Sequence, residues 1–316
     1  MVWAPKKRMM YCPYCDGTDC ESVVGDASTT VCFSCGGEIN VGELESSSKC
    51  PYCDNYLIFD DRVSGEYKPD EIIPFYVSKE DAVEKMEQEF KKRTFAPVSF
   101  LAEKTLKDMK GCYVPFFLYD YKADSVFEGT GTKVRTWRSG DYDYTETSYY
   151  EIKRRMEATY DNIPVDASFA MPDATMDLME PYDYKEFCSF DPKYLSGFFG
   201  EVYSDKEEAF EERAVKKAKS SAHSIVRQSI NGYSSLTAQV EETSLKKGKT
   251  DFALFPVWVY SYLYGGKTYD IFVNGQTGKV VGHTPISMPK VIVYGLTVGG
   301  FIFGMFQFIF RILEVL

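Results

Sequence analysis

The sequence predicts an α+β protein with an N-terminal zinc ribbon, a body built from a duplicated helix-plus-antiparallel-sheet unit, and a C-terminal transmembrane helix. Three observations predict this class. Six of the nine cysteines form three CxxC pairs within the first 53 residues, charged helical segments precede runs of alternating apolar and polar residues, and twenty residues near the C-terminus carry no charge. We place the domain boundaries at 1–60 for the ribbon, 61–200 and 201–288 for the two units, and 289–316 for the transmembrane helix and tail.

The cysteine pairs predict a structural metal site. A CxxC sequence bends so that two thiolates reach one ion, and two such pairs complete a tetrahedron with no open position for a substrate. No apolar signal-peptide core precedes the first pair, so we expect reduced thiols in the cytosol. Sixteen residues separate the first two pairs and fourteen the last two, so spacing alone leaves the pairing open. The candidate ligands of one structural Zn²⁺ are Cys12, Cys15, Cys32, Cys35, Cys50 and Cys53, and Cys20 could contribute to a partial second site with the first pair.

The body shows two helix signals, each followed by strand signals. Ser78 is the predicted N-cap of the first helix, which has acids in its first turn and bases in its last, and the second helix is expected to begin after Ser204. The segments that follow, YVPFFLYDY and LFPVWVYSY, share the same order of residue types: apolar residues, a proline and then aromatic residues. This repetition indicates a duplicated unit whose sheets share one core. Pro115 and Pro256 are expected to mark strand starts or edges.

The C-terminal segment VIVYGLTVGGFIFGMFQFIF, residues 291–310, matches the ~20 residues that cross a bilayer core. With the thiols reduced, it predicts a single-pass protein of the cell membrane whose bulk lies in the cytoplasm. Glycines four apart let two helix backbones approach closely and indicate a helix-pairing face, although glycine is also simply common in membrane helices. The candidate pairing residues are Gly295, Gly299, Gly300 and Gly304.

Composition argues against several function classes. The net charge of -11 disfavours a nucleic-acid partner, and residues 1–60 alone carry four basic and nine acidic side chains. Only two histidines occur, and P-loop, HExxH, GxSxG and GxGxxG motifs are absent from the sequence. We therefore expect a protein that is not an enzyme. A hydrolase that uses acidic residues and a weakly held metal is a further alternative.

Ten segments distributed over roughly residues 30–290 carry a resemblance to a known family. They are CFSCGGEI, KCPYCDNYLIF, PDEIIPF, YVPFFLYD, GTGTKVRTW, YYEI, IPVDAS, LSGFF, FPVWVYSY and NGQTGKVVG. Together they resemble the TFIIB-type zinc-ribbon membrane proteins of Gram-positive bacteria. Members often carry a primosomal-helicase label on account of the ribbon, but the ATPase motifs that such an activity needs are missing from this sequence.

The resemblance implies a role beside PspA-like phage-shock proteins and SPFH-domain scaffolds. It assigns Cys32, Cys35, Cys50 and Cys53 to one ribbon and makes the first cysteine pair the remnant of another. The expected function is a membrane adaptor that recruits or scaffolds envelope-stress proteins, with possible oligomerisation through the membrane helix. The alternative is a membrane-tethered nucleic-acid-binding ribbon protein linked to replication.

Overall fold

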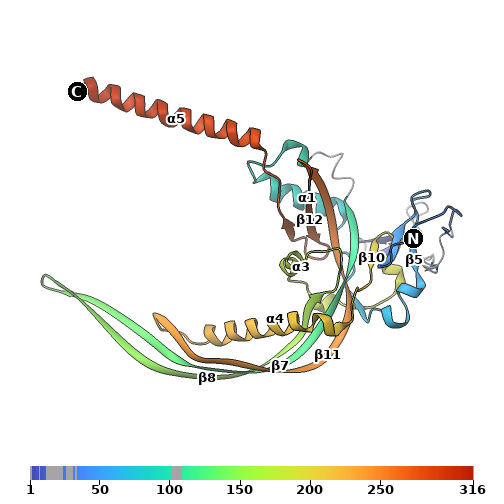
Figure 1. The fold of residues 1–316 in the computed structure, drawn as a ribbon, viewed down its shortest axis with the longest axis horizontal. Coiled ribbons are helices and arrows are strands. Elements are labelled where there is room, and N and C mark those ends of the chain that lie inside the picture. Colours follow the sequence, from blue (N-terminus) through green and yellow to red (C-terminus); the bar gives the residue numbers. More distant parts are fainter. Residues whose placement is uncertain are drawn as a thin grey trace.

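The computed structural model describes residues 2–6, 8–11, 24–25, 31–32, 34–101 and 109–315 (Figure 1). The helices are α1 (Lys79–Lys91), α3 (Asp173–Met179), α4 (Glu207–Gln228) and α5 (Met288–Val315). The strands are β1 (Val2–Ala4), β2 (Met9–Tyr11), β3 (Val24–Gly25), β4 (Glu45–Lys49), β5 (Tyr56–Phe59), β6 (Glu71–Ile72), β7 (Lys110–Ser139), β8 (Tyr142–Asp166), β9 (Cys188–Ser189), β10 (Phe199–Glu201), β11 (Ser235–Tyr264), β12 (Lys267–Asn274) and β13 (Val280–Gly282). The chain thus has the expected mixed helix and sheet class, with a cysteine cluster near its N-terminus and an apolar helix at its C-terminus.

One large sheet organises the molecule. Its strands follow the order β13-β12-β11-β7-β10-β4-β5-β3, with β8 paired to β7, and with β6 paired to both β11 and β9. The central pair, β7 and β11, is antiparallel over most of its length. The ribbon strand β4 pairs with β10 at Gly200↔Ser47, and the Trp3 indole N–H donates to the Phe75 carbonyl at 2.7 Å. Hydrogen bonds therefore connect the N-terminal region directly to the body.

The body repeats one series of elements. A short strand, a helix, a long strand and its hairpin partner occur first as β6, α1, β7 and β8, and then as β10, α4, β11 and β12. The short strands are exchanged, because β6 pairs in parallel with β11 and β10 pairs in parallel with β7. Val114 opposite Phe255 marks the centre of this local two-fold arrangement. The two units are interlocked in one sheet.

The expectation that the two prolines mark strand starts or edges is wrong. Pro115 lies inside β7, where the outer neighbour changes from β10 to β8, and Pro256 lies inside β11, where it changes from β6 to β12. A residue without an N–H group fits such a change of partner because no ladder bond is required there. The carbonyls of both prolines accept hydrogen bonds, from Ala167 N at 2.9 Å and from Gly275 N at 2.8 Å.

The first helix begins as expected and the second begins later than expected. Ser78 caps α1, and its hydroxyl accepts a hydrogen bond from Asp81 N at 3.2 Å. The second helix, α4, begins at Glu207 with Lys206 at the N-cap position. The Ser204 hydroxyl instead donates to the Asp205 carboxylate, so the prediction of a helix that starts directly after Ser204 is corrected by two residues.

Strands β7, β8 and β11 extend from the body as a long curved arm, and α4 lies along its concave side (Figure 1). Small residues at every fourth position bring α4 close to the sheet: Ala214, Ala218 and Ala222 are fully buried. The third strand, β11, begins opposite Thr132. Beyond that residue the arm continues as the two-stranded β7–β8 hairpin, whose side chains are mostly exposed.

Helix α5 leaves the body as a separate rod (Figure 1). Ser287 N donates to Phe95 O at 2.8 Å, and the Lys290 ammonium donates to Ala96 O at 2.6 Å, so its first turn is anchored beside the segment that follows α1. The stretch Met288–Arg311 is long and apolar enough to cross a membrane. Its apolar residues are not buried against the described part of the body. The expected span at 291–310 falls within it.

Candidate functional site

Four cysteines form the densest cluster of metal-ligating side chains in the described part of the chain. The Sγ atoms of Cys32, Cys35, Cys50 and Cys53 all lie within 4.8 Å of one another. The Cys32 and Cys53 sulfurs are 3.9 Å apart, and the Cys35 and Cys50 sulfurs are 3.8 Å apart. Cys32 and Cys50 are buried, whereas Cys35 is exposed. The second and third CxxC pairs therefore converge on one point.

Two matching turns produce this convergence. In the first, Cys32 N donates to Gly37 O and Gly36 N donates to Cys32 O, each at 2.7 Å. In the second, Cys50 N donates to Asn55 O at 2.9 Å and the residue after Cys53 donates back to Cys50 O at 3.1 Å. Both turns place the residue after the second cysteine at positive φ, where Gly36 is strain-free. The Gly-Gly sequence after the first pair is thus part of the metal-binding turn.

The surroundings of the thiols favour ionisation of Cys50 and disfavour ionisation of Cys35. Burial opposes ionisation of Cys50, but backbone N–H groups of Cys53 and Tyr52 outweigh it and lower the pKa of Cys50 to about 7. At Cys35 the backbone N–H of Gly37 favours the thiolate, but partial desolvation of the sulfur and its hydrogen bonds with the neighbouring thiols outweigh it and raise the pKa to about 12. Four thiolates at these distances need the charge of a cation to coexist. The cluster therefore has the donor set and spacing of a metal-binding site.

The other five cysteines of the chain fall into two groups. Cys12, Cys15 and Cys20 lie outside the described residues, so the second site stays a prediction. Cys112 is buried in β7 and its pKa is raised well above the usual value by burial, as expected for a core cysteine. Cys188 lies in the short strand β9.

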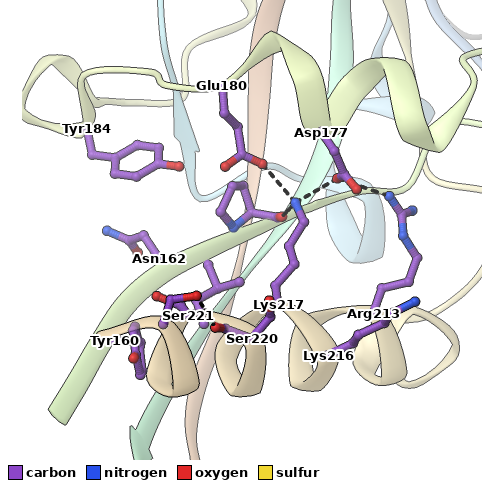
Figure 2. Close-up of a pocket in the computed structure, with 13 residues that line it drawn as sticks. Tyr160, Asn162, Asp177, Glu180, Tyr184, Arg213, Lys216, Lys217, Ser220 and Ser221 are labelled. Atoms are coloured by element: carbon purple, nitrogen blue, oxygen red, sulfur yellow. Dashed lines mark hydrogen bonds and ion pairs between the residues drawn. The ribbon is translucent and has the colours of Figure 1, made fainter. Parts of the chain in front are cut away.

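A second candidate site is a pocket of ≈ 720 Å³ between α4, the end of β8 and the segment after α3. Figure 2 shows Lys217 extending from α4 toward Asp177 and Glu180, with Ser220 and Ser221 further along the same helix. The lining residues are Tyr160, Asn162, Ile163, Pro164, Asp177, Glu180, Tyr184, Arg213, Lys216, Lys217, Ser220, Ser221 and Ser224. None of them is a histidine or a cysteine.

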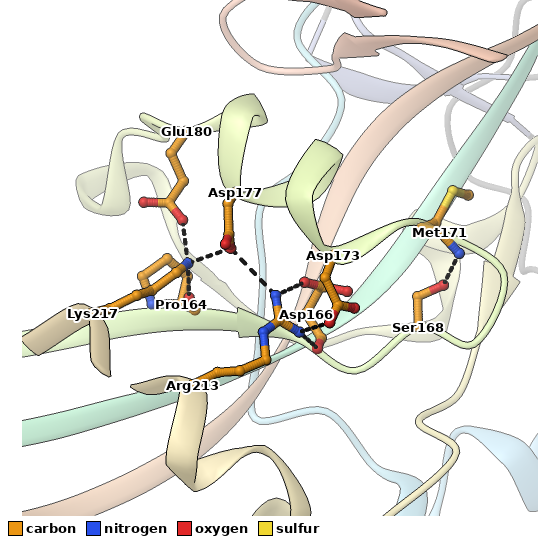
Figure 3. Close-up of polar contacts among 9 residues, drawn as sticks. All are labelled: Pro164, Asp166, Ser168, Met171, Asp173, Asp177, Glu180, Arg213 and Lys217. Atoms are coloured by element: carbon orange, nitrogen blue, oxygen red, sulfur yellow. Dashed lines mark hydrogen bonds and ion pairs between the residues drawn. The ribbon is translucent and has the colours of Figure 1, made fainter. Parts of the chain in front are cut away.

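Two cations of α4 hold this region together (Figure 3). The Lys217 ammonium lies 2.7 Å from Asp177, 2.8 Å from Glu180 and 2.7 Å from the Pro164 carbonyl. Because all three donors of an ammonium can be used by these oxygens, Lys217 is saturated by the protein itself. The neighbouring Arg213 pairs with Asp177 at 3.4 Å, so the carboxylate of Asp177 joins the two cations.

Arg213 also neutralises a buried carboxylate. It donates to Asp166 Oδ1 at 2.8 Å and lies 3.2 Å from Asp173. The Asp166 side chain is inaccessible to solvent, and its Oδ2 atom has no hydrogen-bond partner. Burial raises the pKa of Asp166 above its usual value, and Arg213 opposes that rise. The network latches α4 onto β8 and α3, which is a structural role.

Sequence reasoning missed this network. A usable signal was present, because Arg213 and Lys217 stand four residues apart and therefore share a helix face, next to the face that the buried alanines mark. Their carboxylate partners lie 36 or more residues earlier in the chain. Only the fold brings the two sets together.

The predicted helix-pairing residues occupy exposed positions. Around Gly295, Gly299, Gly300 and Gly304, an added Cβ would meet nothing within 4 Å. Their spacing on one helix is as expected, and the pairing itself stays a prediction.

Comparison with known proteins identifies a relative of this chain. A protein of Bacillus subtilis (strain 168), described as the uncharacterized protein YdjG, is 35% identical over 243 residues, which cover 77% of this chain and 71% of that protein. The chain belongs to the YdjG family. The 243 aligned residues are more than the ribbon and the C-terminal helix contain together. The similarity to YdjG therefore extends into the interlocked body. No protein-family model matches the chain, and no solved structure matches it.

Proposed function

We propose that this protein is a TFIIB-type zinc-ribbon membrane protein that acts as a non-enzymatic adaptor. It recruits or scaffolds envelope-stress proteins of the PspA and SPFH type at the cytoplasmic face of the cell membrane. The observation that carries the proposal is the combination, in one chain, of a closed four-cysteine cluster and an apolar helix that the body leaves unburied.

Zinc is the metal that the cluster fits best. Four thiolates about 2.3 Å from a tetrahedral Zn²⁺ are separated from one another by about 3.8 Å. The observed separations of 3.8 and 3.9 Å match this geometry before any rearrangement. A site with four cysteine ligands has no position left for water, so the ion would hold the ribbon together and perform no chemistry.

The position of α5 supports an anchored protein. An exposed helix of this composition would be costly in water and stable in a bilayer. In Figure 1 the ribbon strand β5 and the tip of α5 lie on opposite sides of the body. With α5 in the membrane, the ribbon would therefore project away from the bilayer, where soluble proteins can reach it. Reduced cysteines would favour a cytoplasmic location of that side.

The ion pairs of the pocket disfavour a hydrolase site there. Lys217 and Arg213 are both used by carboxylates of the protein, so neither is an available group for substrate. The acidic ribbon also disfavours the alternative of a tethered nucleic-acid-binding protein, because a zinc tetrathiolate would add further negative charge.

Purification of the full chain from its own membranes tests the proposal. The protein would be solubilised in mild detergent, and the proteins that accompany it would be identified by mass spectrometry. We expect a PspA-like or SPFH-domain protein, lost when Cys50 and Cys53 are both replaced by serine. A matched control is Cys112→Ser, which changes a cysteine outside the cluster.

Three outcomes would contradict the proposal. The first is recovery of replication proteins or nucleic acid with the wild-type chain. The second is retention of the stress proteins after both ligand cysteines are lost. The third is a chain that stays in the soluble fraction with α5 intact, which would remove the membrane part of the proposal.

A further inference from the structure

The outer edge of β8 carries no partner strand. This 25-residue strand pairs only with β7, from Ser139↔Tyr142 to Phe116↔Asp166, among the residues that the structure describes. Alternate backbone N–H and C=O groups along such an edge point outward and can pair with another strand. Most side chains between Tyr142 and Glu157 are exposed. The arm therefore offers a long strand template at this edge, and β11 leaves a second edge without a partner strand from Ser235 to Asp251 among the described residues.

The sequence at the middle of this edge is self-complementary. When β8 is paired antiparallel with its own copy around Ile152, Glu151 lies opposite Lys153 of the partner subunit. The flanking positions put an exposed tyrosine opposite an arginine on each side, namely Tyr150 with Arg154 of the partner subunit and Tyr149 with Arg155 of the partner subunit. Opposite charges and aromatic–cation pairs at directly facing positions stabilise an antiparallel ladder.

These charges also select the partner. Charged side chains on an edge strand ordinarily prevent pairing with an arbitrary strand. Here the run Lys153, Arg154 and Arg155 would oppose pairing with any basic edge, whereas its own copy presents Glu151 and two tyrosines. The side chains of Glu151 and Lys153 are 76% and 63% exposed and lie 2.9 Å apart, so both can reach a facing strand.

The same pairing supplies what the end of the arm lacks. Beyond Thr132 the β7–β8 hairpin has only two strands, and two-stranded sheets are marginally stable in water. In the antiparallel arrangement around Ile152, residues 144–148 of one copy face residues 156–160 of the other, up to the irregularity of β8 after Tyr160. Each hairpin tip gains a third strand. The two bodies lie at opposite ends of the joined arms.

We propose that two copies of this chain associate through the free edges of β8, with Ile152 on the two-fold axis, to form one continuous sheet from both arms. This interface is independent of the proposed adaptor function and of any contact between membrane helices. It makes the arm the dimerisation element of the protein.

Spin-label distances measured on the full chain in detergent test the register. A labelled amino acid is placed at Tyr149 or at Thr145, both exposed. Because a strand rises about 3.4 Å per residue, the two copies of position 149 should be about 20 Å apart and those of position 145 about 48 Å apart. A dimer formed only through α5 would not produce this pair of distances.

Charge exchange supplies the matched controls. Glu151→Lys or Lys153→Glu places like charges opposite each other and should abolish the 20 Å distance. The double exchange restores opposite charges and should restore it. Lys246→Glu, on the exposed outer strand β11, and Gly299→Leu in α5 should leave the distance unchanged. Absence of both distances in the wild type, or their persistence in both single variants, would overturn the proposal.

Discussion

Replacement of Arg213 by methionine should destabilise the body strongly and in a pH-dependent manner. The arginine is the only side chain that pairs with the carboxylate of Asp166 among the described residues, at 2.8 Å, and the Asp166 side chain is fully buried. Removing one partner of a buried ion pair costs about 3–5 kcal/mol because an uncompensated charge remains. Methionine retains much of the apolar stem, so the loss of packing is small.

The pH dependence follows from the direction of the pKa shift. Burial already raises the pKa of Asp166 in the folded protein, with Arg213 opposing the rise. The pKa of Asp166 is therefore higher in the folded protein than in the unfolded chain. As the pH rises through the interval between these two values and Asp166 ionises, the folded protein loses stability. Without Arg213 the folded pKa rises further. The deficit of the variant should be largest near pH 8 and should shrink as pH falls and Asp166 takes up a proton.

Guanidinium unfolding of the full chain in detergent, followed by tryptophan fluorescence, measures this deficit at two pH values. Lys216→Met is the matched control, because Lys216 is exposed on the same helix, and its effect should stay within about 0.5 kcal/mol. Adding Asp166→Asn to the Arg213 variant should recover most of the loss at high pH. Equal deficits at both pH values, or an Arg213 variant no worse than the Lys216 control, would refute the reasoning.

Two further predictions concern local backbone structure. Ser78→Ala should cost about 1 kcal/mol in thermal or chemical unfolding because α1 loses its cap, while Ser204→Ala should have little effect because Ser204 caps no helix. Gly129→Ala should cost about 1–3 kcal/mol, since an added Cβ would lie 2.3 Å from the Thr237 carbonyl oxygen of the neighbouring strand. Gly299→Ala should be neutral in the same assay because its Cβ would meet open space, and equal effects of the two glycine changes would contradict the packing.

Local sequence signals predicted several features correctly. The cap at Ser78 and the apolar helix α5 depend on neighbouring residues, so a pattern within a few positions is sufficient. The ribbon cysteines depend on spacing within one short segment. For these features the chain needs no distant partner to define the structure.

Other features depend on contacts between distant segments. The exchange of β6 and β10 between units, the position of Pro115 inside a strand, and the latch around Arg213 each require residues far apart in the chain. Alternation of residue types indicates a strand but not its neighbour, so a proline at a change of partner resembles a proline at an edge. The repeated segments did indicate duplication, whereas their interlocking follows only from the strand pairing.

Recruitment to liposomes tests the central claim most directly. The full chain would be reconstituted into liposomes, zinc content measured, and a purified PspA-like or SPFH-domain partner added to the side that carries the ribbon. The account predicts that replacement of Cys50 and Cys53 removes one zinc ion per chain. It also predicts that the partner sediments with liposomes that carry the wild-type chain and does not sediment with liposomes that carry the variant. Equal sedimentation with both, or none with a zinc-loaded chain, would contradict it.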